Sequence, residues 1–105
     1  MSRIAAALFF VIMARVASAD SPTVDELRAK AEAGDGAAAG LLGARYFGGE
    51  GVDRDYEEAV RWFKLAADKG DAIGEEGLGQ AYLSGAGIPR DLDKALEYAR
   101  RAADK

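Results

Sequence analysis

Few side chains in this sequence are of the types that usually do chemistry. The chain contains no histidine and no cysteine, so the commonest general base, the thiol nucleophile and the usual soft metal ligands are all missing. Carboxylates stand in adjacent pairs at Glu57–Glu58 and Glu75–Glu76. Neighbouring residues on a helix point about 100° apart, so neither pair can converge on one substrate. We interpret both pairs as parts of a solvated helix face.

Two other patterns, a nucleophilic serine and a phosphate loop, are also too weak to predict a site. Beyond the N-terminal segment, serines occur only at Ser21 and Ser84, and neither lies in a nucleophile elbow. The glycines of residues 48–51 lack the following Lys-Ser/Thr of a phosphate loop, and the stretch returns as Ser-Gly-Ala-Gly at 84–87. The sequence therefore predicts no catalytic residue, no cofactor, no metal site and no enzyme activity.

The most distinctive residues recur as a set 36 positions later. Gly34–Lys69 and Gly70–Lys105 are identical at 14 of 36 aligned positions. The first copy is marked by Leu42, Gly43, Tyr46, Gly49, Gly51, Asp55, Ala59, Trp62, Ala66 and Ala67. A period in this range indicates stacked repeats, each of which buries its apolar face only against its neighbours.

Capping residues and glycines divide the repeats into helices. Thr23-Val-Asp-Glu26 fits a capping box, in which the Thr23 hydroxyl accepts from a backbone amide three residues on. Asp35, Asp55 and Asp91 are placed to cap later helices. Gly34 and Gly70 are placed to end helices in the left-handed conformation. These signals predict an all-α fold of about five helices.

The expected helix of the first repeat that follows Asp55 is amphipathic. Its apolar residues stand at i, i+3, i+4, i+7 and i+8, beginning at Ala59. Trp62 and Phe63 belong to this stripe, so we interpret both as core residues and not as parts of a ligand site.

Glycines inside the expected helices have two consequences. Gly43 returns as Gly79, which indicates that a neighbouring helix approaches closely at these positions. Gly74, Gly77 and Gly79 together could cost on the order of 2–3 kcal/mol relative to alanine. These glycines weaken the first helix of the second repeat.

The N-terminal segment Met1–Ala19 has the layout of a secretory signal peptide. It has Arg3, an uninterrupted apolar run from Ile4 to Met13, and a small-residue cleavage site at residues 17–19. A bilayer needs about 20 apolar residues, so we expect cleavage and no stable membrane insertion afterwards; an uncleaved anchor is the alternative. The chain would then be exported to the periplasm or secreted, and residues 20–22 would form a linker.

The charge of the chain disfavours nucleic acid as a partner. The net charge is −4 at pH 7, and it falls to about −6 if the N-terminal segment is removed, since that segment holds two arginines and no acidic residue. An acidic body without a basic stripe is a poor match for nucleic acid or anionic lipid. Without cysteines, stability has to come from packing.

The two repeats resemble Sel1-like repeats, which are related to tetratricopeptide repeats. Both copies share the pattern L-G-x-x-Y-x-x-G-x-G-[VI]-x-x-D-x-x-x-A-x-x-[WY]-x-x-x-A-A. The resemblance covers a half repeat at 23–33 and full repeats at 34–69 and 70–105. It implies an α/α solenoid with a right-handed superhelix that acts as a protein-binding scaffold. Many bacterial members are exported, and some act in signalling or in regulating the cell envelope. A cysteine-rich branch linked to β-lactams should not be carried over, because this chain has no cysteine.

By analogy with tetratricopeptide repeats, a partner protein would lie on the concave surface formed by the first helix of each repeat. The exposed positions there would be Ala37, Ala44, Phe47, Ile73, Glu76, Gln80 and Leu83. We expect Phe47, Ile73 and Leu83 to anchor apolar side chains of the partner; packing within the fold is the alternative for each.

Three other possibilities follow from the sequence and the resemblance. The chain could be an enzyme or enzyme subunit acting on a cell-wall or β-lactam-like substrate. It could be one fragment of a longer repeat array. The last helix keeps apolar residues at positions that face water in a terminal helix, so we also expect either marginal stability or self-association through residues 91–105.

Overall fold

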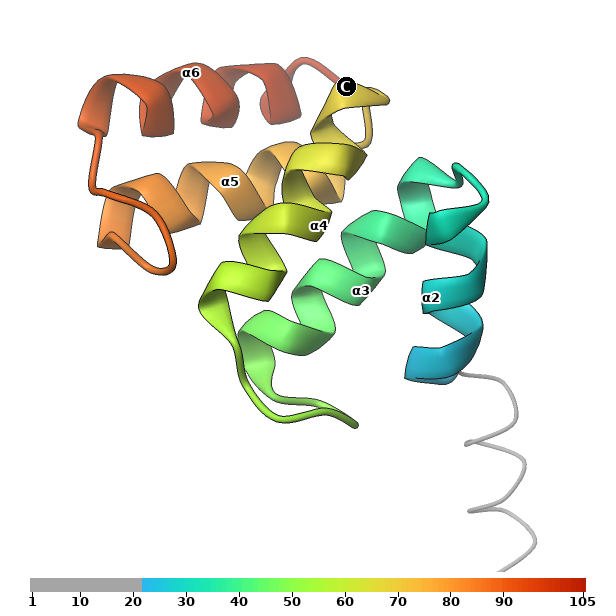
Figure 1. The fold of residues 1–105 in the computed structure, drawn as a ribbon. Coiled ribbons are helices and arrows are strands. Elements are labelled where there is room, and N and C mark those ends of the chain that lie inside the picture. Colours follow the sequence, from blue (N-terminus) through green and yellow to red (C-terminus); the bar gives the residue numbers. More distant parts are fainter. Residues whose placement is uncertain (1–21) are drawn as a thin grey trace, which may run out of the picture.

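The structure is a computed structural model that describes residues 22–105. The expected signal segment, residues 1–19, lies outside the described residues. The described part consists of five α-helices and no strand, and Figure 1 shows how the helices are arranged. The helices are α2 (Val24–Glu32), α3 (Gly36–Gly48), α4 (Tyr56–Asp68), α5 (Ala72–Ser84) and α6 (Leu92–Ala103). The expectation of an all-α fold is confirmed.

Each helix begins at a side chain that accepts a hydrogen bond from a backbone amide three residues on. All five of these bonds are 3.1 Å long. The capping residues are Thr23, Asp35, Asp55, Asp71 and Asp91. Gly34 and Gly70 have φ angles of 102° and 77°, which end α2 and α4 as the sequence predicts. Short-range polar chemistry thus sets where the helices begin and end.

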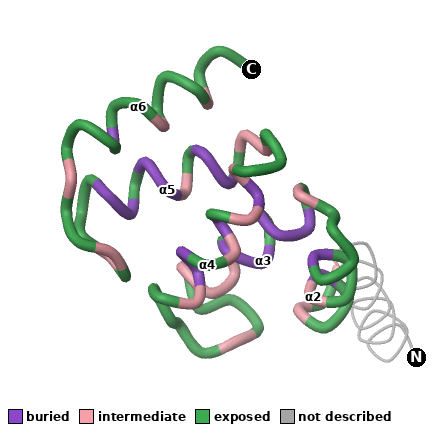
Figure 2. The backbone as a smooth tube through the Cα atoms, turned by 45° about the horizontal axis from the view of Figure 1, so that its top comes forward, coloured by how far each residue is buried: buried purple, intermediate pink, exposed green. Residues whose placement is uncertain are grey.

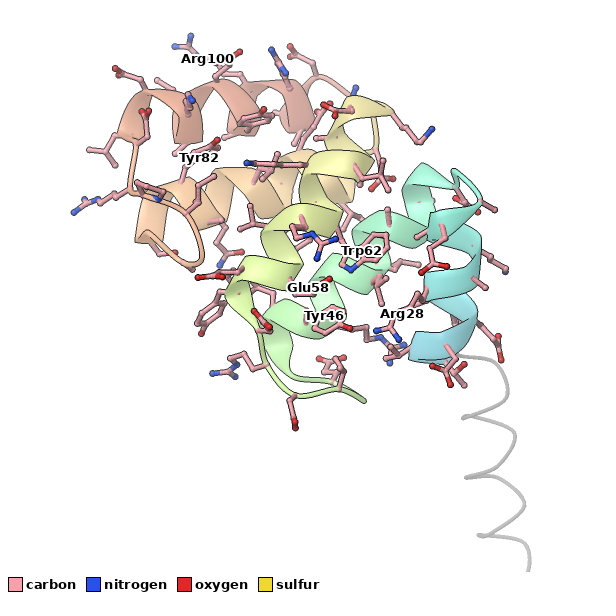
Figure 3. The ribbon with its side chains drawn as sticks, viewed as in Figure 1. Arg28, Tyr46, Glu58, Trp62, Tyr82 and Arg100 are labelled. Atoms are coloured by element: carbon pink, nitrogen blue, oxygen red, sulfur yellow. The ribbon has the colours of Figure 1, made fainter. Side chains whose placement is uncertain are left out.

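The helices stack in chain order to form an α/α solenoid. Helix α3 packs against α2 and α4, and α5 packs against both α3 and α4. Within residues 22–105, helix α6 packs only against α5, and Figure 1 shows it at the edge of the stack. At the other end, the Arg28 side chain of α2 reaches Tyr46 of α3, donating a hydrogen bond to its hydroxyl (Figure 3). The α3–α4 pair and the α5–α6 pair are the two full repeats.

The core consists of two clusters that meet along α3 and α4. One is formed by Leu27, Ala31, Ala38, Ala39, Leu42 and Ala66, and the other by Ala59, Val60, Phe63, Leu78, Ala81, Tyr82 and Ala95. Trp62 is half-buried against the first cluster, so both Trp62 and Phe63 belong to the core as expected. Figure 2 shows buried segments running along α3 and α5, whereas α6 is mostly exposed.

Glycines at the helix contacts allow α4 and α5 to lie close together. A Cβ atom added at Gly74 would lie 2.5 Å from the Ala66 Cβ and 2.6 Å from the Ala67 backbone nitrogen. One added at Gly77 would lie 2.6 Å from the Phe63 ring. These glycines therefore have a cost in helix propensity but also a benefit, because they allow the second repeat to pack closely against the first. Gly43 likewise faces the Phe63 ring, 2.6 Å from an added Cβ, as the sequence indicates.

The interpretation of Glu75 as part of a solvated face is wrong. Glu75 is only 3% exposed, and its Oε1 lies 3.3 Å from the Nζ of Lys105. Position 75 faces the end of α6, so the carboxylate is buried at the α5–α6 contact beside a cation from the end of the chain. The other residues of the two carboxylate pairs keep contact with solvent, and Glu58 pairs with Arg61 at 3.0 Å.

Candidate binding surface

The α5–α6 pair carries an open, mostly apolar groove of about 830 Å³. From α5 it is lined by Ala72, Glu76, Gly79, Gln80 and Leu83, and from α6 by Leu92, Ala95, Leu96, Ala99, Ala102 and Ala103. We call this surface the α5–α6 groove. Most of its lining residues are alanine, glycine or leucine, so it suits an apolar ligand surface better than a small charged molecule.

The groove is lined by buried small residues, such as Gly79 and Ala95, and by exposed leucines. Gly79 lies against the backbone of α6, because an added Cβ would be 3.4 Å from the Ala95 carbonyl oxygen. Leu83, Leu92 and Leu96 are 55%, 54% and 53% exposed. Large apolar side chains with half of their surface in water are candidates for contact with a partner.

The surface of the first repeat that is equivalent to the α5–α6 groove is covered by another helix of the fold. Thirty-six residues before Leu96 and Ala99 stand Val60 and Phe63, which are only 4% and 3% exposed. They are buried because α5 lies across α4, with Gly77 against the Phe63 ring. Among residues 22–105, the α5–α6 groove is thus the uncovered counterpart of a surface that receives a helix in the first repeat.

The structure brings together three of the seven residues predicted to bind a partner. Glu76, Gln80 and Leu83 all line the α5–α6 groove and are exposed. Leu92 and Leu96 on the opposite side of the groove are not among these seven residues, although they lie within residues 91–105, for which the sequence predicts self-association. A signal for Leu96 was present, because its counterpart Val60 stands within the apolar positions of the first repeat.

The other four predicted residues lie away from this groove. Ala37 and Ala44 are exposed on α3. Ile73 is 37% exposed and packs toward Gly40, where an added Cβ would be 3.2 Å from its Cβ. Phe47 is half-buried against the core, with its ring centroid 5.0 Å from that of Tyr56. For Phe47, packing within the fold accounts for the side chain.

Other kinds of site find no support in the described residues. In residues 22–105, no group of three acidic, histidine or cysteine side chains is arranged to hold a metal ion. No helix in that part of the chain is both long enough and apolar enough to cross a membrane. The polar groups beside the groove are the Glu76 carboxylate and the Gln80 amide, which can orient a ligand by hydrogen bonding.

Comparison with known proteins points to one family. A family model described as Sel1 repeat matches residues 36–71 and 72–105, beginning at the first residues of α3 and α5. A solved structure of c5321, described as a protective antigen of uropathogenic Escherichia coli strains displaying an SLR fold, is 38% identical with a TM-score of 0.74. A Sel1 repeat protein from Oxalobacter formigenes is 31% identical with a TM-score of 0.72. A search of curated protein sequences found no match.

The similarity to the two solved structures covers most of this chain but only part of theirs. Each match spans 77% of this chain, and it spans 17% of the Escherichia coli protein and 33% of the Oxalobacter protein. What those longer proteins do as wholes is therefore not transferred with the fold.

Proposed function

The chain belongs to the Sel1 repeat family, and from that premise we propose that it is a protein-binding scaffold without catalytic activity of its own. The α5–α6 groove is its principal binding surface. The ligand is an amphipathic helix, since apolar grooves between helices receive the apolar face of such a helix. The premise supports this proposal because Sel1 repeats typically serve as protein-interaction scaffolds.

One observation carries the proposal. The surface of the first repeat equivalent to the groove is covered by α5, which buries Val60 and Phe63 to 4% and 3% exposure. The groove therefore has the shape and composition of a surface on which a helix packs. Leu83, Leu92 and Leu96 supply the apolar contacts, since large side chains at the centre of an interface contribute most of its binding energy.

We propose that this scaffold works outside the cytoplasm, in the periplasm or after secretion, in signalling or regulation at the bacterial envelope. The signal-like segment Met1–Ala19 supports export. The net charge of −4 favours a protein partner over nucleic acid. Self-association through residues 91–105 would use the same groove.

The test is capture of a partner by the full chain from an extract of the source cells, followed by mass spectrometry. Leu83→Glu places a charge in the groove, whereas Arg61→Glu changes the charge of an exposed residue on α4 outside it. We expect the wild type and Arg61→Glu to enrich the same protein and Leu83→Glu to lose it. Equal enrichment by Leu83→Glu, or no enrichment by any form, would contradict the proposal.

A further inference from the structure

The exposed side of α6 has the pattern of a helix-pairing seam. Leu92, Leu96, Ala99 and Ala103 are spaced by four, three and four residues along α6, which is the spacing of a and d positions in a coiled coil. All four are exposed and all four line the groove. We call this set the α6 stripe. It faces the position that α5 occupies relative to α4 in the first repeat.

Large and small residues are divided along the α6 stripe. Its two leucines occupy the first half of α6 and its two alanines occupy the second half. An antiparallel pair of α6 helices related by a two-fold axis would place Leu92 opposite Ala103 of the second copy, and Leu96 opposite Ala99 of the second copy. Each large side chain would meet a small one, which is the condition for close packing between helices.

The hollow above Ala99 favours this pairing further. In the first repeat the equivalent position holds Phe63, whose ring fills the space against Gly77. With alanine at position 99, the same space is free for a side chain that enters from outside. Leu96 of the second copy is large enough to occupy it.

Charges beside the stripe agree with the antiparallel direction. Asp93 and Arg100 flank the stripe on the side of α6 away from α5, as a rotation of 100° per residue places them. Arg100 extends from the outer side of α6 in Figure 3, and within residues 22–105 neither residue takes part in an ion pair. Two-fold pairing brings Asp93 next to Arg100 of the second copy, at both ends of the seam.

We propose that the α5–α6 groove receives α6 of a second copy of this chain, in an antiparallel two-fold dimer. This inference rests on the proposed function, since it identifies the helix that the groove binds. Leucine-to-alanine contacts form the centre of the interface. The two Asp93–Arg100 pairs set the direction of pairing, because reversing one helix would remove both of them.

Charge reversal tests the direction of pairing. The full chain is purified in the form in which it is isolated from cells. Its molar mass is measured by light scattering and sedimentation at protein concentrations between about 1 and 100 µM, which correspond to modest binding affinities. We expect a concentration-dependent dimer. Asp93→Arg and Arg100→Asp should each weaken dimerisation about tenfold or more, because symmetry places two like-charged pairs in each variant dimer.

Mixing the two variants gives the decisive result. In a heterodimer of Asp93→Arg with Arg100→Asp, both pairs are again opposite in charge, so the equimolar mixture should dimerise about as well as the wild type. Glu57→Arg changes the charge of an exposed residue on α4 and should leave dimerisation unchanged. It is the matched control.

A monomeric wild type at about 100 µM, or variants whose mixture associates no better than each alone, would overturn the proposed dimer. Either outcome leaves the capture of another protein by the groove to be decided by the Leu83→Glu comparison. If Leu83→Glu loses a captured protein while the wild type is monomeric, only the inference of a second copy fails. If neither association occurs, both fail.

Discussion

Replacing Gly74 by alanine is a sensitive test of how the second repeat seats on the first. In an exposed helix this change is stabilising by about 1 kcal/mol, because alanine has the higher helix propensity. Here the added Cβ would lie 2.5 Å from the Ala66 Cβ, 2.6 Å from the Ala67 nitrogen and 2.9 Å from the Ala66 carbonyl carbon. Two of these three atoms belong to the backbone of α4, so no side-chain rotation can relieve the contact.

The expected magnitude follows from those distances. Non-bonded carbon atoms normally stand about 3.5–4.0 Å apart, so α5 must move away from α4 by roughly 1 Å. That movement loosens the contact between Gly77 and the Phe63 ring. Overpacking of this kind costs about 1–3 kcal/mol, and it exceeds the gain in propensity. We expect Gly74→Ala to lower the free energy of unfolding by about 2 kcal/mol and the Tm by roughly 10 °C.

The assay is thermal and urea unfolding of the full chain followed by helical circular dichroism. Gly48→Ala serves as the control, because Gly48 ends α3 and an added Cβ there would come no closer than 3.6 Å to any atom beyond its chain neighbours and the backbone of its own helix. That variant should be neutral or slightly stabilised. If Gly74→Ala proved as stable as the wild type or more stable, the close approach of α4 and α5 would not hold the repeats together as argued.

Three further changes separate the fold from the binding surface. Lys105→Ala leaves the buried carboxylate of Glu75 without its cation and should lower the free energy of unfolding by about 1–2 kcal/mol in urea titration. Lys105→Arg keeps a cation there and should retain most of the wild-type free energy of unfolding. Asp71→Ala removes the cap that accepts from the Gly74 amide and should cost about 1 kcal/mol by the same measurement, whereas Asp71→Asn should cost little. Leu96→Glu should change the free energy of unfolding by less than about 0.5 kcal/mol, because the side chain is half exposed, yet it should abolish binding in the groove as measured by sedimentation.

The helices could be predicted from the sequence because their signals act over a few residues. Asp35 and Asp55 each cap a helix through an amide three residues away, and such bonds form wherever the spacing allows. The 36-residue period likewise requires no knowledge of packing. These local patterns indicate both the number of helices and their stacking.

The contacts that could not be predicted join residues far apart in the sequence. From the sequence, Glu75 is predicted to be a surface residue like Glu76. In the structure, the end of α6 brings the Lys105 Nζ to 3.3 Å from the Glu75 Oε1. The groove could not be predicted for a similar reason, because it joins two helices. Analogy placed partner binding on the first helix of each repeat, which includes Leu83, and the last helix separately indicated self-association through residues 91–105. The structure places Leu83, Leu92 and Leu96 along one groove.

Cross-linking within cells tests the central claim, that the α5–α6 groove holds a helix, most directly. A photoreactive amino acid is placed at position 96 in one variant of the full chain and at position 57 of α4 in another. We predict that irradiation yields a covalent adduct through position 96 and none through position 57. An adduct of twice the chain mass would identify the second copy, and any other mass would identify a different protein. No adduct at position 96, or equal adducts at both positions, would contradict the account.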